Sequence, residues 1–402
     1  MQHKSPLPFA EFVALMAALM AMGALGIDAM LPALPDIGAR LGIASENTRQ
    51  YVITAFLVGL GAGQLLHGPL ADRFGRRPTM LTMLALYVVA TVLCAVSGSF
   101  TLLLAARFLA GTAIASTRVC VTAMVRDCYE GRAMARVMSI SFIVFMIVPV
   151  LAPAFGTAVL AAGSWRAIFW SIVALTLAVL AWFAWRMPET MDPADRLPIA
   201  PARIAAGWRH ALVDRLSLGY TLAAAALMGA LYGYLNSIQQ IVGDVFGRPT
   251  LLAGVFAATA ATMAAANLLN ARIVMRLGTR RISHGAVSLL ILTSAAHLVL
   301  TLSGHEQLGT FVVLQAVQMA CFGLAASNFS AMAMQNMGHI AGTASSVQGF
   351  LSLTLGAGVG ALIGQSFDGS TAPLTAGFLL AGLAALAIVA ATERGQLFRA
   401  SA

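Results

Sequence analysis

The sequence contains twelve apolar runs, each about as long as a lipid bilayer is thick. About 20 helical residues span the hydrocarbon core, because a helix rises about 1.5 Å per residue. Only 10% of the residues are charged and 59% are hydrophobic, whereas a soluble domain carries about 25% charged residues. We therefore predict an all-α membrane protein with twelve transmembrane helices. The runs are 9–31, 49–70, 78–97, 101–123, 135–161, 165–187, 216–240, 250–275, 282–303, 307–334, 340–366 and 371–392.

The longest polar stretch, 187–215, lies between the sixth and seventh runs. It predicts three parts: an N-terminal six-helix half at 1–187, a cytoplasmic linker at 188–212 and a C-terminal six-helix half at 213–402. A polar stretch of this length between two sets of six runs is typical of a chain built from two membrane units.

An internal repeat supports two pseudo-symmetric halves. The segment GPLADRFGRRP, 68–78, aligns with ARIVMRLGTRR, 271–281, at an offset of 203 residues, which is almost half of 402. Each copy lies between the second and third run of its half, as duplication of a six-helix unit requires. In the second copy, Met275 replaces the acidic Asp72. The matched pairs are Arg73 with Arg276, Gly75 with Gly278, and Arg77 with Arg280.

The distribution of basic residues predicts the orientation. Of 24 Lys and Arg residues, 18 lie in the N-terminus, the even-to-odd connections and the C-terminus, and four lie on the opposite side. Positive charge stays in the cytoplasm during insertion, so both termini are expected there, in a bacterial inner membrane. The net charge of +9 then reflects topology and affinity for anionic lipid. Nucleic-acid binding is excluded as a function because the basic residues are scattered over separate short segments.

The sequence offers no cofactor site. Its four cysteines lie in or beside apolar runs without metal-ligand spacing, and we expect neither a metal nor a disulfide. The pattern G-x-x-x-x-G-K-[ST] for nucleotide phosphates is absent from the sequence. ATP is therefore not the expected energy source.

Five stretches resemble motifs of a known transporter family. The loop segment GPLADRFGRR after the second run is similar to the signature of the major facilitator superfamily. The stretches 107–127, RFLAGTAIASTRVCVTAMVRD, and 148–156, VPVLAPAFG, resemble its fourth-span and fifth-span antiporter motifs, with Thr157 in place of a glycine. IDAMLPALPDI and AGTASSVQG resemble the drug:proton antiporters of the bicyclomycin and chloramphenicol resistance branch. The resemblance implies two six-helix halves that work by alternating access.

The loop segment predicts a gating element. Its glycines and proline favour a tight reversal, and its acid lies at the membrane edge, where an arginine or a helix N-terminus stabilises a carboxylate. The resemblance implies that this cluster holds the two halves in the outward-facing state. The alternative is a topology signal only. The candidate gating residues are Gly68, Asp72, Arg73, Gly75, Arg76, Arg126 and Asp127.

Asp28 is the candidate proton site. Of 15 acidic residues it alone lies well within an apolar run, where ionisable groups are costly and usually functional. Arg107 lies at a similar depth in the fourth run, so an ion pair between them is expected to be geometrically feasible. The pair would serve proton and substrate coupling. The alternative for Asp28 is a structural cap for the following LPALP segment.

Two further spans carry candidate residues. Pro149, Pro153 and Gly156 in the fifth run favour a bent helix that packs closely on its neighbour, although membrane helices also tolerate proline without such a role. In the seventh run, aromatic and amide side chains would contact a drug-sized molecule if they faced a central cavity. These are Tyr232, Tyr234, Asn236 and Gln239.

The leading hypothesis is a transporter, not an enzyme, that exports small organic compounds in exchange for protons. It needs no cofactor, because the proton gradient supplies the energy. The expected partners are hydrophobic or amphipathic drug-like substrates, protons and membrane lipids, and we expect a monomer. The alternative is a metabolite exporter or a facilitator without proton coupling. A membrane enzyme or receptor would need catalytic clusters or an extramembrane domain, for which the loops are too short.

Overall fold

The structure, a computed structural model, describes residues 6–398 except 44, 130, 197 and 199. Every regular element in these residues is helical. The chain forms two compact units, unit 1 (Met1–Pro201) and unit 2 (Ala202–Ala402). The division falls inside the stretch predicted as the linker, which itself contains a short helix. The bounds predicted for the linker stay a prediction.

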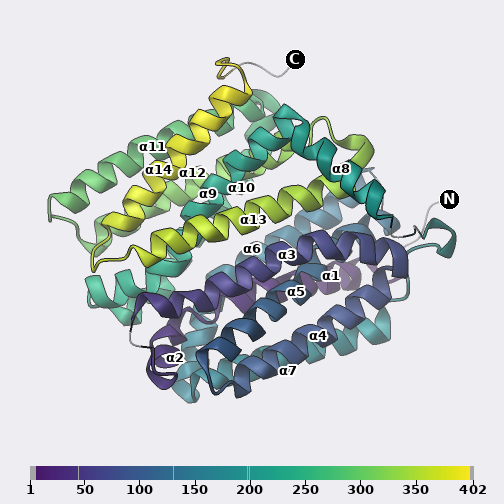
Figure 1. The fold of residues 1–402 in the computed structure, drawn as a ribbon, viewed down its shortest axis with the longest axis horizontal. Coiled ribbons are helices and arrows are strands. Elements are labelled where there is room, and N and C mark those ends of the chain that lie inside the picture. Colours follow the sequence, from purple (N-terminus) through teal and green to yellow (C-terminus); the bar gives the residue numbers. More distant parts are fainter. Residues whose placement is uncertain (1–5, 44, 130, 197, 199, 399–402) are drawn as a thin grey trace. The chain divides into compact units, whose positions relative to one another are not determined.

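The described part of unit 1 contains six long helices and four short helical segments (Figure 1). The long ones are α1 (Phe9–Asp28), α3 (Tyr51–Phe74), α4 (Arg76–Val96), α5 (Phe100–Cys128), α6 (Gly131–Ala162) and α7 (Trp165–Arg186). The short ones are η1 (Leu31–Ala33), α2 (Leu34–Arg40), η2 (Asn47–Gln50) and η3 (Pro193–Asp195).

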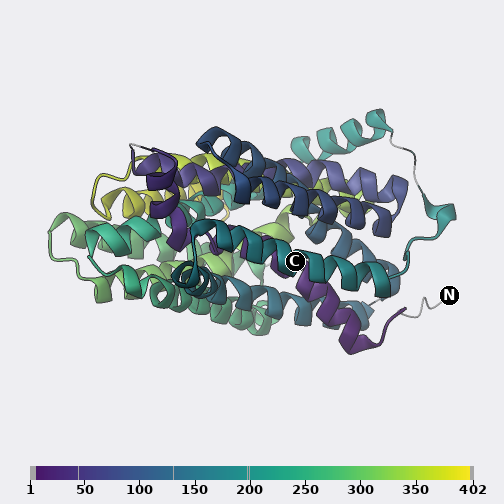
Figure 2. The same ribbon diagram turned by 90° about the horizontal axis from the view of Figure 1, so that it is seen from below.

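Unit 2 also has six long helices among its described residues, preceded by a short one, α8 (Figure 2). The long ones are α9 (Arg215–Gln240), α10 (Leu252–Leu277), α11 (Thr279–Leu302), α12 (Leu308–Ala333), α13 (Ala341–Gln365) and α14 (Ala372–Thr392). The short ones are α8 (Pro201–Val213), η4 (Ile241–Val245), η5 (Pro249–Leu251) and η6 (Gly338–Ile340).

The long helices match the predicted runs. Among the described residues, 11 helical stretches are long and apolar enough to cross a membrane. The helix α6 adds 32 residues with a described apolar part at Ile147–Ala162. Lipid offers the backbone no hydrogen-bond partners, so each apolar run bonds its own amides and carbonyls as a helix. The predicted all-α, multi-pass membrane fold is confirmed.

The first span ends earlier than its apolar run. Helix α1 stops at Asp28, and the chain continues through η1 and α2 to Arg40. Pro32 and Pro35 lack the amide hydrogen that a continuing α-helix needs, so the path breaks into short helical turns. The residue predicted to lie inside the first span is therefore the last residue of its first helix.

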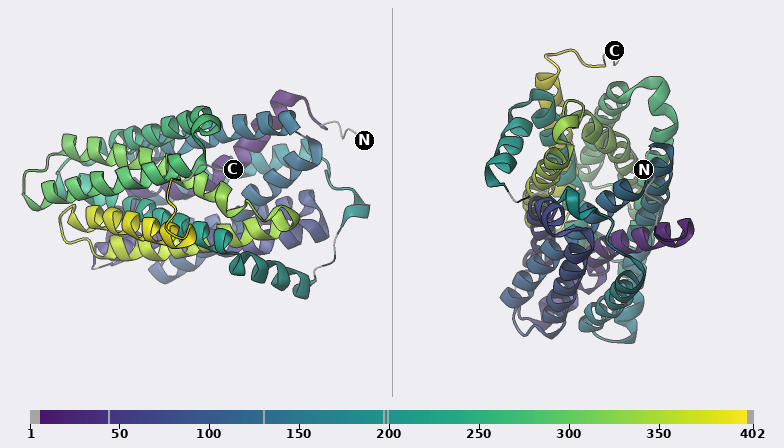
Figure 3. Two further views of the ribbon diagram at one scale, coloured as in Figure 1. Left: turned by 90° about the horizontal axis from the view of Figure 1, so that it is seen from above. Right: turned by 90° about the vertical axis from the view of Figure 1, so that its right-hand side faces the viewer.

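The two units pair their helices in the same way. In unit 1, α5 packs against α3 and α4, and α4 also packs against α7. In unit 2, α12 packs against α10 and α11, and α11 also packs against α14. Figure 3 shows α11, α12 and α14, in green to yellow, side by side. This shared pairing is what the internal repeat predicts.

Glycines bring particular helix pairs into backbone contact. A Cβ atom added at Gly59 of α3 would collide with the Phe108 carbonyl of α5, and one at Gly111 of α5 would collide with the Phe56 carbonyl of α3. In unit 2, the same holds between α13 and α9. Small residues allow membrane helices to approach this closely, so each unit contains tightly joined helix pairs.

Candidate functional site

Helices α3 and α4 meet at a single residue, Gly75. It has φ 103° and ψ 160°, a backbone conformation that is essentially restricted to glycine. The sequence predicted that both glycines and a proline of this segment favour the reversal, but Gly68 and Pro69 lie inside α3, which continues to Phe74. A membrane helix tolerates an internal proline because neighbouring groups compensate for the missing hydrogen bond. The reversal therefore depends on Gly75 alone.

Arg76 is the centre of an ion-pair network at this turn. Its side chain is only 5% exposed. Its Nη1 donates to Asp72 Oδ1 at 2.6 Å, and its Nε donates to Asp127 Oδ2 at 3.2 Å. The Thr190 hydroxyl also donates to Asp127 Oδ2, at 3.1 Å. Paired carboxylates stabilise a guanidinium that is buried this deeply, so the network holds the end of α3, the start of α4 and the end of α5 together.

Glu189, which no sequence pattern had indicated, lies against the turn. Its carboxylate accepts the backbone N–H groups of Arg76 at 3.0 Å and Arg77 at 3.2 Å. These are amides of the first turn of α4, which have no partner within the helix, and the helix dipole favours an anion there. Arg77 in turn donates to the carbonyls of Met187 and Ala184, both at 2.7 Å. The segment after α7 therefore holds the turn.

The other predicted gating residues contribute less to these contacts. Arg73 and Arg126 are exposed, and Gly68 lies half-buried on α3. The network around Arg76 lies within unit 1. The predicted role of the cluster in holding the two halves together stays a prediction.

Asp28 is buried at the end of α1, with 4% exposure. Its Oδ1 atom has no hydrogen-bond partner among the described residues. An ionised carboxylate in this setting is costly because nothing replaces the water that it loses. The site therefore favours a bound proton or a ligand that supplies a donor.

Arg107 is also buried, at 2% exposure, but it does not form the expected ion pair with Asp28. Its Nη1 donates to the Gly26 carbonyl at 2.8 Å, its Nε donates to the Val52 carbonyl at 3.0 Å, and its guanidinium lies 4.2 Å from the Phe56 ring centroid. Carbonyl dipoles and an aromatic face can stabilise a cation, which the sequence pattern did not reveal. Arg107 thus joins α1, α3 and α5. Its contact on α1 is the carbonyl of Gly26, two residues before Asp28.

Gly156 of α6 packs against the C-terminal end of α1. Gly156 lies against the Ala29 carbonyl so closely that a side chain would collide with it. Pro149 and Pro153 lie inside α6, and the Thr157 hydroxyl donates to the Pro153 carbonyl at 2.9 Å. The close packing places α6 beside the segment that follows Asp28. The predicted bend stays a prediction.

The aromatic and amide residues predicted for a substrate cavity lie on α9, and all are buried. Tyr234 shares a hydrogen bond of 2.7 Å with Thr259 and stacks on Phe256 with ring centroids 6.0 Å apart. Gln239 Oε1 has no hydrogen-bond partner in the part of the chain that the structure describes. Directly after α9, η4 has π-helical geometry, which is rare and frequently found at functional sites. The remaining members of this set are Tyr232 and Asn236.

Two units of six long helices, a glycine turn with buried ion pairs and a buried acid on α1 define a membrane transporter. A family model described as the Major Facilitator Superfamily matches residues 13–361. The chain therefore belongs to the Major Facilitator Superfamily, and it is a transporter rather than an enzyme.

Three curated relatives are each 30% identical to this chain. The bicyclomycin resistance protein homolog of Haemophilus influenzae matches over 373 residues, 90% of this chain and 91% of that one. The MFS-type transporter YdgK of Bacillus subtilis matches over 87% of both chains. The multidrug resistance protein MdtL of Escherichia fergusonii matches over 57% of this chain and 58% of its own. These matches confirm the family predicted from the motifs.

A solved structure has the same fold. The human organic anion transporter MFSD10 (TETRAN) aligns with a TM-score of 0.65, over 94% of this chain and 100% of that chain. The sequence identity is 19%, so this similarity shows the fold alone.

Proposed function

We propose that this protein exports small drug-like organic compounds across the bacterial inner membrane in exchange for protons. The observation that carries the proposal is the buried Asp28 carboxylate, whose Oδ1 has no partner among the described residues. The names of two relatives, for bicyclomycin resistance and multidrug resistance, support the substrate class. The basic residues gathered on one side support termini in the cytoplasm.

Asp28 would bind a proton and a substrate in alternation. When the site opens to the cytoplasm, an arriving substrate displaces the proton. When it opens outside, where proton activity is higher, protonation releases the substrate. Each charge that crosses the membrane gains about 2.3 kcal/mol per 100 mV, so the coupling would drive accumulation against a gradient without a cofactor.

Arg107 would position the end of α1 for this exchange. It binds the Gly26 carbonyl, two residues before Asp28, and it has no ion pair with that acid in this structure. A rearrangement of the α1 end that brought the carboxylate to the guanidinium would favour the ionised form. Under this proposal, the network around Arg76 stabilises one conformation of the cycle, and the α9 residues contact the substrate.

The test is drug uptake into inverted membrane vesicles energised by a pH gradient, with bicyclomycin as the first probe. We expect wild type to concentrate the drug and to release protons, whereas Asp28→Asn does neither at matched expression. The control is Asp36→Asn, which changes an exposed acid on α2 and should transport normally. A mutant at Asp28 that still concentrates drug and still dissipates the gradient would show that another group couples the proton.

The second candidate function is a metabolite exporter or a facilitator without proton coupling. The buried aromatic and amide groups of α9 would suit such a substrate equally well. Reconstituted protein that equilibrates its substrate at the same rate at all pH values, without proton release, would favour this candidate.

A further inference from the structure

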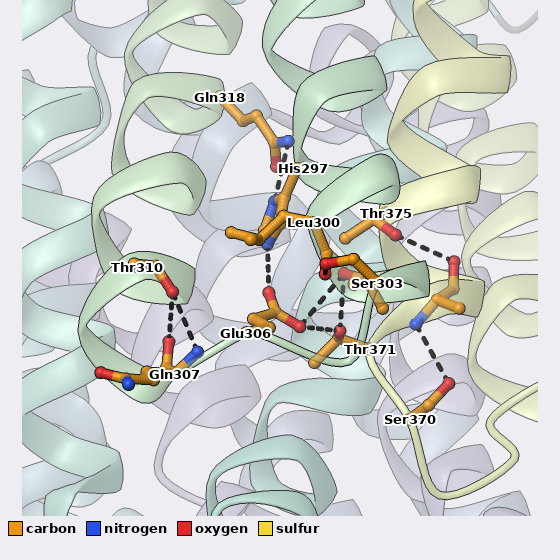
Figure 4. Close-up of polar contacts among 12 residues, drawn as sticks. His297, Leu300, Ser303, Glu306, Gln307, Thr310, Gln318, Ser370, Thr371 and Thr375 are labelled. Atoms are coloured by element: carbon orange, nitrogen blue, oxygen red, sulfur yellow. Dashed lines mark hydrogen bonds and ion pairs between the residues drawn. The ribbon is translucent and has the colours of Figure 1, made fainter.

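A buried polar cluster surrounds His297 at the C-terminal end of α11 in unit 2 (Figure 4). His297 Nε2 lies 2.6 Å from Glu306 Oε1. The other oxygen, Glu306 Oε2, accepts the Thr301 hydroxyl at 3.1 Å and the Thr371 hydroxyl. Glu306 lies between α11 and α12, and Thr371 precedes α14. The carboxylate therefore links two connections that are far apart in the sequence.

The carboxylate of this cluster is held in its ionised form. The side chains of His297 and Glu306 are 0% and 8% exposed. Burial alone raises the pKa of Glu306, but the hydrogen bonds from His297, Thr371 and Thr301 outweigh it and hold the pKa below its ordinary value. A buried anion of this kind favours a positive charge beside it, and His297 is the adjacent group that can supply one.

The second ring nitrogen of His297 lies beside the side-chain amide of Gln318. This amide can donate a hydrogen bond to a neutral imidazole or accept one from a protonated imidazole. Gln318 Nε2 lies 3.2 Å from His297 Nδ1, and Gln318 is fully buried. With neutral His297, Nε2–H donates to Glu306, and Nδ1 accepts the Gln318 amide hydrogen. Gln318 Oε1 has no partner among the described residues. Rotation of the amide would present this oxygen to a proton on Nδ1, because an amide end offers either donors or an acceptor.

We propose that His297, Glu306 and Gln318 form a proton-binding site in unit 2, separate from Asp28 in unit 1. The proton binds at His297 Nδ1 and is shared with Gln318 Oε1, while Nε2–H continues to donate to Glu306. The proposal goes beyond the exchange proposed for Asp28, because the site can bind a proton whatever drives transport.

Other charged groups do not contact the cluster in the described structure. Helix α14 contains no titratable side chain, and α12 contains only Cys321. Phe311 of α12 lies against the imidazole, with 5.6 Å between the ring centroids. The nearest other titratable groups by chain position are His305 and Asp368, both exposed. The remaining ones on α10 and α11 lie near the opposite ends of these helices, at Arg272, Arg276, Arg280, Arg281 and His284.

Proton uptake would strengthen the link between α11 and the α11–α12 connection. An imidazolium facing Glu306 adds charge to a hydrogen bond that already joins α11 to the α11–α12 connection, and charge-assisted hydrogen bonds are the stronger ones. In the orientation proposed above, this end of unit 2 faces the outside. The site would then fill from the side with higher proton activity.

The test is a pH titration of the full-length protein labelled with ¹⁵N-histidine, followed by NMR. The His297 signal is assigned by its loss in His297→Gln. We expect the wild-type imidazole to pass from one protonated nitrogen to two as the pH is lowered. Glu306→Gln should lower the midpoint by about 1–3 pH units, because the imidazolium loses its anion. Gln318→Met should lower it less, because it removes an uncharged acceptor.

The control is His305→Gln, which removes an exposed neighbour and should leave the His297 midpoint unchanged. An imidazole that keeps a single proton throughout the titration would overturn the proposal. Wild-type midpoints in both Glu306→Gln and Gln318→Met would also overturn it, and the second variant suffices if the first fails to fold. The titration in Asp28→Asn should match wild type, so failure of transport and failure of this site are distinguishable.

Discussion

The α3–α4 turn of unit 1 and the α10–α11 turn of unit 2 have the same backbone and different side chains. Gly75 adopts φ 103° and ψ 160°, and Gly278, which lies 203 residues later, adopts φ 80° and ψ 153°. Each glycine both ends one helix and precedes the next. The geometry of a direct helix-to-helix reversal has thus been kept in both copies.

The ion pairs of Arg76, in contrast, have no counterpart at the aligned positions of unit 2. In unit 1, Arg76 lies between Asp72 and Asp127. At the same offset of 203 residues, unit 2 has Met275, Thr279 and Ser330. The comparison teaches that the turn needs its glycine but not its ion pairs. The ion pairs are therefore better explained by a role specific to unit 1 than by folding of the turn.

Each unit has a carboxylate after its last long helix, but the two carboxylates make different contacts. Glu189, three residues after α7, caps the amides of Arg76 and Arg77. Glu393, directly after α14, accepts instead from Arg280 Nε at 2.8 Å and from the Tyr220 hydroxyl at 2.6 Å. A carboxylate close to the end of the last long helix thus stabilises a helix start in one unit and a side-chain pair in the other.

The largest effect should come from the glycines. Gly75→Ala and Gly278→Ala each force a side chain into a conformation that costs about 1–3 kcal/mol. At Gly75 the new Cβ also collides with the Glu189 carboxylate, so this variant should lose more thermal stability in detergent. Gly98→Ala is the control, because nothing lies within 4 Å of the added atom. Equal losses at both turns would remove the distinction between them.

An intermediate effect is expected for Asp127→Asn. It removes one charged partner from the buried Arg76, and a hydrogen bond between charged groups contributes about 1.5–3 kcal/mol. Thermal unfolding and drug transport would both be measured. The matched control is Met275→Asp in unit 2, which should change stability by less than about 0.5 kcal/mol, because Met275 is 89% exposed. A stable Asp127→Asn variant would show that Asp72 alone satisfies Arg76.

The smallest effect is a pH dependence at Glu393. Burial raises the pKa of Glu393, but the hydrogen bonds from Tyr220 and Arg280 hold it below its ordinary value of 4.5. The stability it contributes is therefore complete above about pH 4.5 and is lost as the pH falls through the lower folded value. Glu393→Gln should flatten this part of the stability profile. Identical acid profiles for variant and wild type would show that the ion pair contributes nothing.

The sequence predicted the helices well and the contacts of single side chains poorly. Apolar runs long enough to cross a bilayer leave few alternatives, and Gly75 and Gly278 were matched by their offset. In contrast, Glu189 is 113 residues from Arg76, and no local pattern links them. No sequence pattern pairs His297 with Glu306, because Glu306 lies beyond the end of the run that contains His297.

The predicted pair of Asp28 and Arg107 shows the same limit. Similar depth in the membrane suggested contact, but depth does not fix the direction in which a side chain points. Arg107 instead binds carbonyls of Gly26 and Val52, and every backbone has carbonyls. The sequence therefore identifies which polar groups are buried, and only the packing decides what satisfies each of them.

The close contact of α9 and α13 has a consequence for genetics. A side chain at Gly229 or Gly233 would meet the branched ends of Val359 or Ile363, so a smaller residue at the partner position can restore the fit. A side chain at Gly360 would instead meet backbone atoms of α9, which no substitution can shorten. Substitutions of the α9 glycines should therefore be rescued by second-site mutations on α13. A substitution of Gly360 should be rescued only by reversion to glycine.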